Sequence, residues 1–378
     1  MSDEEYLGLK LPAPIGIGTG LVALDIVING WENESPLLSV GGSCGNVMAI
    51  LAYLGWKSIP VARIGDDLAA DFIAKDFTKF GATLDLLFRE KTGRTAAVIE
   101  VIPVRTSSTR THFFSFTCPH CGAQLPRHRP ILKASVPGII EHVPKASVFY
   151  FDRVSAATLE LAKHYSAQGT LVVFEPSSFK NGRVFKQCLD VAHIVKYSHE
   201  RVGDISDSPR DLTPLLEVDT LGAHGLRFRT RRQNGHPSKW EYLEAYKVDN
   251  LKDEAGSGDW CTAGILHLLG QEGISTLQEA SRDIILKVLS FGQALAALNC
   301  CFEGARGAMY SLSLEQVRKA VADIMAGKTL QTTPQTNMTE AVERLLHTIC
   351  TNCLNSYKTA DLKRVMAQNS NERRRANR

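Results

Sequence analysis

The stretch Asp253-Glu-Ala-Gly-Ser-Gly-Asp259 decides how the rest of the chain is interpreted, because an apolar helical pattern follows it over residues 260–269. Two glycines around one small residue allow a tight turn that aims backbone N–H groups at one point. At the amino end of a helix these donors lack helical partners, and the helix dipole favours an anion there. Asp259 can accept a proton from a hydroxyl. Alone, the pattern is equally consistent with Asp259 simply capping the helix.

Outside this stretch, short apolar strands alternate with helices along most of the chain. Strands are expected at residues 15–28, 59–64, 148–151, 171–174, 194–196 and 218–221. Helices are expected at residues 46–55, 68–80, 156–168, 260–269, 277–301 and 314–325. Such alternation predicts an α/β fold with a doubly wound, mainly parallel sheet that carries helices on both faces.

Several additions to this core are expected. Residues 95–116 alternate and are rich in β-branched and aromatic side chains, which predicts a hairpin or a small separate sheet. A compact Cys/His/Pro insertion follows at residues 118–130, within a main domain of residues 1–329. Beyond this domain we expect a polar linker at residues 330–339, a helical C-terminal extension at 340–368 and a disordered tail at 369–378.

A second motif lies near the amino end of the chain. Gly41-Gly42-Ser-Cys-Gly-Asn46 precedes a helix, and Arg63-Ile-Gly65-Asp66-Asp67 and Phe80-Gly81-Ala82 follow it. Their order and spacing closely resemble the N-terminal signature of the ribokinase-like (PfkB) carbohydrate kinases. Gly256-Ser-Gly-Asp259 resembles the C-terminal signature of the same family. The resemblance spans roughly residues 15–325 and implies a small β-lid with strands within about 15–45 and 88–117.

The resemblance implies ATP-dependent phosphorylation of a hydroxyl on a sugar or nucleoside, which makes the protein a phosphotransferase with an alcohol group as acceptor. It implies Asp259 as the general base, and Gly256, Ser257 and Gly258 as the anion hole. Substrate contacts carried over from the family fall on Asp25 at the end of the first strand, Gly42 and Asn46. Nucleotide contacts fall on Ser198, Thr220, Gly222 and Gly225. The implied cofactors are ATP and Mg²⁺, with a monovalent cation such as K⁺ beside Asp253, and lids of this family often pair as homodimers.

Other interpretations remain open at individual positions. Asp25 is otherwise a turn residue, and Asn46 is otherwise a helix N-cap. Ser198 and Arg201 stand where the family has an Asn and a Glu that helps to order magnesium, and Glu200 is adjacent. These departures leave a second hypothesis from another class, a non-catalytic sugar or nucleotide sensor on the same fold. A third hypothesis is a zinc-stapled interaction module whose C-terminal extension serves a partner.

Two cysteine pairs suggest a metal site. Cys118-Pro-His-Cys121-Gly122 has the spacing of a zinc knuckle, and Cys350-Thr-Asn-Cys353 lies in the C-terminal extension. Together they predict a structural Zn²⁺ site of four thiolates, with His120 and His128 as alternative ligands. The second pair is equally consistent with two core side chains on one side of a helix.

Composition excludes several classes of protein. The chain has 378 residues, 44% of them hydrophobic and 22% charged, and a net charge of +3. So small a net charge gives no reason to expect a nucleic-acid partner. We expect no membrane association, because no apolar run approaches the roughly 20 residues that cross a bilayer. The opening residues, Ser2 to Glu5, are acidic rather than basic as in a signal peptide, so we expect a cytoplasmic protein.

Overall fold

The computed structural model describes residues 8–9, 12–29, 37–102, 112–118, 121–179, 182–203, 214–231, 235–328, 349–350 and 352. The predicted linker, nearly all of the predicted helical extension and the predicted tail lie outside the described residues, as do His120 and Cys353. Within the described residues, no helix is long and apolar enough to span a membrane.

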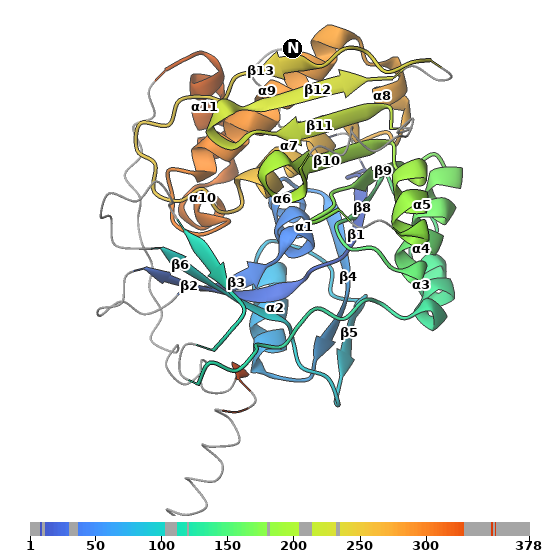
Figure 1. Cartoon of the computed structure of the whole chain (residues 1–378), viewed down its shortest axis with the longest axis vertical. Coiled ribbons are helices and arrows are strands. Elements are labelled where there is room, and N and C mark those ends of the chain that lie inside the picture. The colour runs from blue at the N-terminus through green and yellow to red at the C-terminus, as the bar shows by residue number, and fades with distance from the viewer. Residues whose placement is uncertain are drawn as a thin grey trace, which may run out of the picture.

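The main sheet has nine strands in the order β13-β12-β11-β10-β9-β8-β1-β4-β5 (Figure 1). They are β1 (Ile15–Thr19), β4 (Lys57–Gly65), β5 (Leu87–Glu90), β8 (Val148–Phe151), β9 (Leu171–Phe174), β10 (Ile194–Ser198), β11 (Leu216–Thr220), β12 (Leu226–Thr230) and β13 (Glu241–Leu243). Neighbouring strands from β5 to β11 run parallel, and β12 and β13 add an antiparallel edge. The predicted mainly parallel sheet is therefore confirmed.

Helices cover both faces of the sheet, which explains why the central strands β8 and β9 are apolar throughout. On β8, Val148 and Tyr150 join one hydrophobic core, whereas Phe149 and Phe151 join another on the opposite face. The first core is covered by α1 (Ser43–Tyr53), α2 (Leu68–Lys79), α7 (Ser257–Leu269), α8 (Ser275–Glu279), α9 (Arg282–Asn299), α10 (Gly307–Ser311) and α11 (Leu314–Met325). The second is covered by α3 (Val136–His142), α4 (Ala156–Ala167) and α5 (Arg183–Val191), drawn together in green in Figure 1. The short α6 (His199–Val202) follows β10.

A separate four-stranded sheet, called the lid sheet below, lies beside the main sheet. Its order is β3-β2-β6-β7, with β2 (Ala23–Asn29), β3 (Leu37–Gly41), β6 (Ala97–Ile102) and β7 (Phe113–Ser115). The single strand expected at residues 15–28 is therefore wrong, because this run forms β1 in the main sheet and β2 in the lid sheet. The chain turns between them at Gly20, where φ is 152° and an added Cβ would lie 1.6 Å from Oδ1 of Asp152.

Two helix boundaries also differ from the expectation, and each has a local cause. Helix α1 begins at Ser43 rather than residue 46, because Gly42 takes a positive φ of 75° and serves as its N-cap. The helix expected at 277–301 is two helices, α8 and α9. The side chain of Ser281 accepts a hydrogen bond from the Ile284 N–H and so starts the second one.

Candidate active site

The candidate site lies at the edge of the main sheet where the parallel strands end. Asp152 follows β8, Glu175 follows β9, and Ser198 and Thr220 are register partners at the ends of β10 and β11. The amino end of α7 reaches the same edge, since the Thr262 hydroxyl donates to Oε2 of Glu175 over 2.7 Å. In open α/β sheets this edge is where ligands bind.

The turn before α7 is built around Gly256. Gly256 is left-handed, with φ 70°, and an added Cβ would lie 2.1 Å from the carbonyl oxygen of Ala305. The N–H of Ser257 donates to the Glu254 carbonyl over 3.2 Å, so this predicted anion-hole donor has a partner within the protein. The N–H groups of Gly258 and Asp259 are the remaining donors of the first turn, where a helix offers no carbonyl partner. The N-cap of α7 is Gly256, and no side chain caps the helix. Asp259 lies inside the first turn, so the alternative that it caps the helix is wrong.

The carboxyl group of Asp259 is buried, with a relative exposure of 9%. Its Oδ2 accepts a hydrogen bond of 2.7 Å from Nδ2 of Asn46. Burial, together with the negative charge of Glu175, raises the pKa of Asp259 to about 7, although the Asn46 hydrogen bond and the charges of Arg201 and Lys196 oppose the rise. A carboxyl group with a pKa near neutrality is suited to proton transfer.

The substrate residues predicted from the sequence form a continuous chain of contacts that ends at Asp259. The Asp25 carboxyl group accepts a hydrogen bond from the Gly42 backbone, and the Gly42 carbonyl accepts one from the Asn46 N–H over 2.8 Å. Asn46 then donates to Asp259. Among the described residues, Oδ1 of Asn46 is buried without a hydrogen-bond partner. Among the residues that the structure describes, it is thus an acceptor that no donor uses.

Both open alternatives at these positions are wrong. Asn46 lies inside α1 rather than at its N-cap, and Asp25 lies in the middle of β2 rather than in a turn or at the end of the first strand. Burial raises the pKa of Asp25 to about 7, against the effects of Arg306 and the Gly42 hydrogen bond. The lid sheet therefore contributes a buried carboxyl group close to α1.

Lys196 is a site residue that the sequence interpretation missed. It lies on β10 with 2% of its side chain exposed, and its Nζ is 2.7 Å from Oε1 of Glu175. Burial alone would lower the pKa of Lys196, but the charge and hydrogen bond of Glu175, together with Cys261 and Asp259, outweigh burial, and the pKa lies above its ordinary value. An added Cβ on Gly258 would lie 3.7 Å from this Nζ. A buried cation thus sits directly beside the α7 turn. The sequence feature that could have indicated Lys196 is a lysine inside a mostly apolar predicted strand.

The four residues predicted to contact the nucleotide differ in their surroundings. Ser198 and Thr220 lie next to each other, and the exposed Gly222 has open space where a Cβ would be. Gly225 is buried, and an added Cβ would lie 2.1 Å from the carbonyl oxygen of Leu243. Packing alone therefore requires glycine at position 225, whereas the open surface at Gly222 leaves room for a ligand.

Asp253 is fully buried and ties the α7 turn to its surroundings. Its two oxygens accept hydrogen bonds from the N–H groups of Ala255 (3.0 Å) and Gly304 (2.8 Å), and Nδ1 of His112 lies 3.2 Å from Oδ1. Ligand atoms of Glu100, His112 and Asp253 all lie within 4.8 Å of one another. The sequence interpretation gave no role to Glu100 on β6 or to His112 beside β7. Asp253 thus joins the turn to the lid sheet.

Three of the four predicted zinc cysteines come together. The Sγ atoms of Cys118, Cys121 and Cys350 lie within 4.8 Å of one another, although Cys350 is distant in the sequence. His128, one alternative ligand, does not belong to this group of described residues; burial lowers its pKa to about 4.

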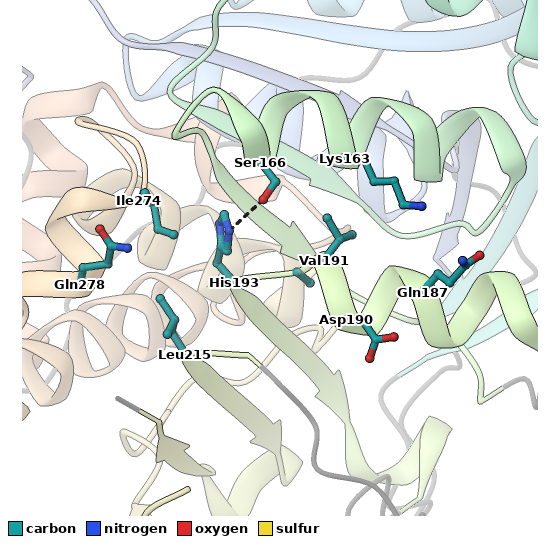
Figure 2. A pocket seen from close by; sticks show the side chains of 10 residues that line it. Lys163, Ser166, Gln187, Asp190, Val191, His193, Leu215, Ile274 and Gln278 are labelled. Atoms are coloured by element: carbon teal, nitrogen blue, oxygen red, sulfur yellow. Dashed lines mark hydrogen bonds between the residues drawn. The ribbon is translucent and has the colours of Figure 1, made fainter. Parts of the chain in front are cut away.

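A groove of about 540 Å³ lies elsewhere, between α4, α5 and the loop before α8 (Figure 2). It is lined by His193 and Leu215, which precede β10 and β11, so it opens at the amino ends of these strands. Ser166 Oγ lies 3.2 Å from Nε2 of His193, and burial lowers the pKa of His193 to about 4. The groove therefore lies at the edge of the sheet opposite to Asp259.

Comparison with known proteins finds relatives in sequence and in fold. No family model matches the chain. Probable fructokinase-2 from Arabidopsis thaliana is 24% identical over 302 residues, which cover 72% of this chain and 84% of the relative. The structure of fructokinase with bound ATP from Xylella fastidiosa aligns with a TM-score of 0.60 and 20% identity, over 82% of this chain and 98% of that one. Ribokinase from Arabidopsis thaliana, solved with ribose and ATP, aligns with a TM-score of 0.59 and 17% identity, over 83% and 99%.

The fold is therefore that of ribokinase. The fructokinase relatives and the ribokinase fold agree with the resemblance to the ribokinase-like (PfkB) carbohydrate kinases that the two sequence motifs carry. The predicted enzyme class, a phosphotransferase with an alcohol group as acceptor, agrees with these fructokinase relatives.

Proposed function

We propose that the protein transfers the γ-phosphoryl group of ATP to a hydroxyl of a sugar or nucleoside, with Asp259 as the general base. The contact between Asn46 and Asp259 carries this proposal, because it joins the two sequence motifs in one place. There a carboxyl group with a pKa of about 7 lies beside the first-turn N–H donors of α7. A base beside an anion-binding turn is the arrangement that phosphoryl transfer to an alcohol requires.

In the proposed reaction, Asp259 accepts the proton of the attacking hydroxyl. The substrate oxygen forms a bond to the γ-phosphorus as the bond to the bridging oxygen breaks, and ADP leaves. The backbone donors at the start of α7 and the buried charge of Lys196 stabilise the negative charge on the transferring group. Ser257 and Gly256 shape this turn, and the role of Ser257 as a third donor stays a prediction.

The acceptor is expected to carry several hydroxyl groups. Asp25 offers an acceptor, as does Oδ1 of Asn46, which has no hydrogen-bond partner in the described part of the chain. Gly42 allows close approach of the backbone. A hydroxyl can donate to such acceptors, so a polyhydroxy ring fits this wall. The fructokinase relatives favour a sugar over a nucleoside.

ATP would bind across the ends of β10 and β11, at Ser198, Thr220 and Gly222. Mg²⁺ binds mainly through phosphate oxygens and water, with one or two carboxylates from the protein. Glu175 already accepts hydrogen bonds from Tyr150, Lys196 and Thr262, so the exposed Glu200 on α6 is the better carboxylate for this ion. When bound, Mg²⁺ would neutralise phosphate charge. The K⁺ site beside Asp253 stays a prediction.

We propose that the lid sheet closes over the substrate, because water would otherwise accept the phosphoryl group. The lid also suits pairing in a homodimer. Phe113 and Phe114 on β7 and the nearby Phe116 are exposed aromatic side chains. Aromatic residues gathered on one surface are typical of interfaces.

The test is ADP release from Mg-ATP across a panel of sugars and nucleosides. We expect a substrate-dependent signal that falls about 10²–10⁴-fold in Asp259→Asn, the usual contribution of a general base. Asp283→Asn, at an exposed carboxylate on α9, is the matched control and should keep full activity. Full activity in Asp259→Asn would overturn the proposal. Silence across the panel, with sugar binding still detectable by thermal shift, would favour the sensor.

A further inference from the structure

Three cysteine side chains from two distant parts of the chain meet beside the lid sheet. Cys118 and Cys121 belong to the insertion that follows β7, and Cys350 lies near the carboxyl end. The Sγ atoms of Cys121 and Cys350 are 3.5 Å apart, and all three lie within 4.8 Å of one another. Thiolates bound tetrahedrally at 2.3 Å from Zn²⁺ are separated by about 3.8 Å. The three side chains thus have the spacing of a thiolate metal site.

The backbone of the insertion presents its two cysteines in a tight turn. The N–H of Cys118 donates to the Ala123 carbonyl over 2.7 Å, and the N–H of Gly122 donates to the Cys118 carbonyl over 2.9 Å. Gly122 has φ 69°, a conformation that favours glycine. Thr117 and Gln124 pair across the base of the turn. These contacts fit the zinc knuckle that the sequence predicts at Cys118 and Cys121.

The segment that carries Cys350 packs against the hydrophobic core beside the insertion. Ile349 and Cys350 are 3% and 1% exposed, and they join the same hydrophobic core as Cys118 and Leu125. Nη2 of Arg94 donates to the Ile349 carbonyl over 3.4 Å. Figure 1 shows this segment in red below the lid sheet, far from α11. Cys350 is therefore held against the insertion.

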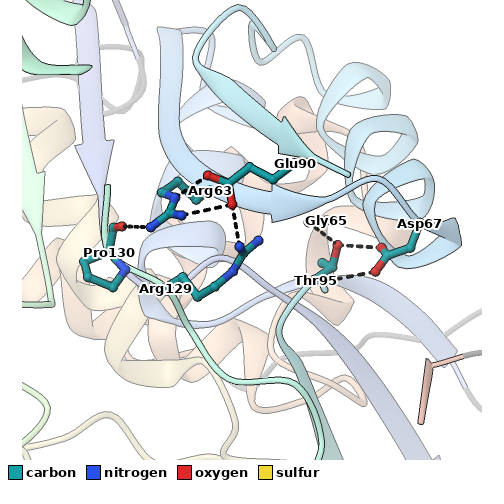
Figure 3. A network of polar contacts seen from close by, with 7 residues as sticks. All are labelled: Arg63, Gly65, Asp67, Glu90, Thr95, Arg129 and Pro130. Atoms are coloured by element: carbon teal, nitrogen blue, oxygen red, sulfur yellow. Dashed lines mark hydrogen bonds and ion pairs between the residues drawn. The ribbon is translucent and has the colours of Figure 1, made fainter. Parts of the chain in front are cut away.

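The insertion is fixed in turn to the main sheet (Figure 3). Arg129 pairs with Glu90 on β5, whose other oxygen lies 2.5 Å from Nε of Arg63 on β4. Nearby, Asp67 accepts hydrogen bonds from the N–H and the hydroxyl of Thr95, just before β6. A metal bound by the cysteines would thus connect the carboxyl-terminal segment to a rigid part of the molecule.

We propose that Cys118, Cys121 and Cys350 bind one Zn²⁺ as thiolates, in a structural site that fastens the carboxyl-terminal segment to the base of the lid. Thiolates are the ligands that Zn²⁺ prefers, and closed thiolate sites are structural rather than catalytic. A disulfide between Cys121 and Cys350 would leave the buried Cys118 without a role in the cluster, whereas one metal ion uses all three. The fourth ligand is not among the described residues; the sequence predicts Cys353.

The site is independent of the proposed kinase reaction, so its test uses metal content rather than activity. The full chain, purified under reducing conditions from cells supplied with zinc, should contain one Zn²⁺ per chain by elemental mass spectrometry. Cys118→Ser, Cys121→Ser and Cys350→Ser should each lose it. Cys188→Ala, at a buried cysteine of the other hydrophobic core, is the control and should keep it.

Cobalt substitution tests the site in the native chain, so it gives a result even if a cysteine variant fails to fold. Co²⁺ in place of Zn²⁺ should give intense thiolate charge-transfer absorption in the native chain. An absorption intensity that corresponds to four thiolates in the native chain and to three in Cys353→Ser would support the complete four-cysteine site. An intensity that corresponds to three thiolates in both the native chain and Cys353→Ser would support the proposal with a different fourth ligand. Absence of zinc and of cobalt–thiolate absorption in the native chain, or a Cys121–Cys350 disulfide in the freshly isolated protein, would overturn the proposal.

Discussion

Asp253 and Asp259 lie at the two ends of one turn, both buried, yet their carboxyl groups have opposite pKa shifts. Burial would raise the pKa of Asp253, but hydrogen bonds from His112, Glu100 and the Ala255 backbone outweigh burial, and the pKa is lowered. Asp259 accepts one hydrogen bond from Asn46 and faces Glu175, so its pKa rises to about 7. The number of donors around a buried carboxyl group thus decides whether it holds the structure together or remains able to exchange a proton.

The largest effect that this comparison predicts is on the reaction rate. Asp259→Asn should lower kcat/KM about 10²–10⁴-fold without loss of stability, because the change replaces a group that is costly to ionise where it lies. The folded-state pKa is raised, so ionising Asp259 costs stability as pH rises from about 4 to 7. The melting temperature of the variant at pH 8 should therefore equal or exceed that of the native protein. A marked fall in melting temperature would show that Asp259 is structural like Asp253.

The second largest predicted effect concerns Asp253, whose replacement should lower stability rather than the reaction rate. Asp253→Ala leaves the buried N–H groups of Ala255 and Gly304 without their acceptor, at about 1–3 kcal/mol each. We expect the free energy of unfolding in urea to fall by about 2–6 kcal/mol. Asp249→Ala, at an exposed ion pair with Lys247, should change it little. If Asp253→Ala kept full stability but lost activity, Asp253 would belong to the chemistry instead.

These two carboxyl groups also mark what the sequence could predict. The glycine pattern around them, with the helix that follows, is a local signal, and it located the turn at Gly256 and the carboxyl group of Asp259. The strands at 148–151 and 171–174 were predicted to the residue, because a short apolar run bounded by polar residues has one interpretation in an alternating pattern.

What the sequence did not reveal depends on partners that are distant along the chain. Lys196 gains its role only when β9 brings Glu175 beside it, and Glu100 only when the lid sheet meets Asp253. The division of residues 15–28 between two sheets depends on Asp152, which occupies the space beside Gly20. The run itself contains no polar stretch that would mark the break, because both of its strands are largely buried and mostly apolar.

A smaller effect should appear in the pH profile. Native kcat/KM should rise with pH to a plateau, with its midpoint near the Asp259 pKa of about 7. Asn46→Ala removes the hydrogen bond that favours the ionised carboxylate, so the midpoint should move upward by about one unit. Asn250→Ala, at an exposed position, is the control. An unmoved midpoint would mean that another group, and not Asp259, sets the acid limb.

The smallest effect concerns Glu100, the neighbour that shares the Asp253 cluster. Burial, and then the charge of Asp253, hold the pKa of Glu100 well above its ordinary value of 4.5. The native state therefore keeps a proton that the unfolded chain releases, and stability falls as pH rises from 4.5 through the raised pKa. Glu100→Gln imitates the protonated acid and can still donate to Asp253. Its melting temperature should depend less on pH than that of the native protein and be equal or slightly higher at pH 8. A lower melting temperature at pH 8 would mean that ionised Glu100 is a favourable partner of His112, so that the lid junction is held by charge rather than by a shared proton.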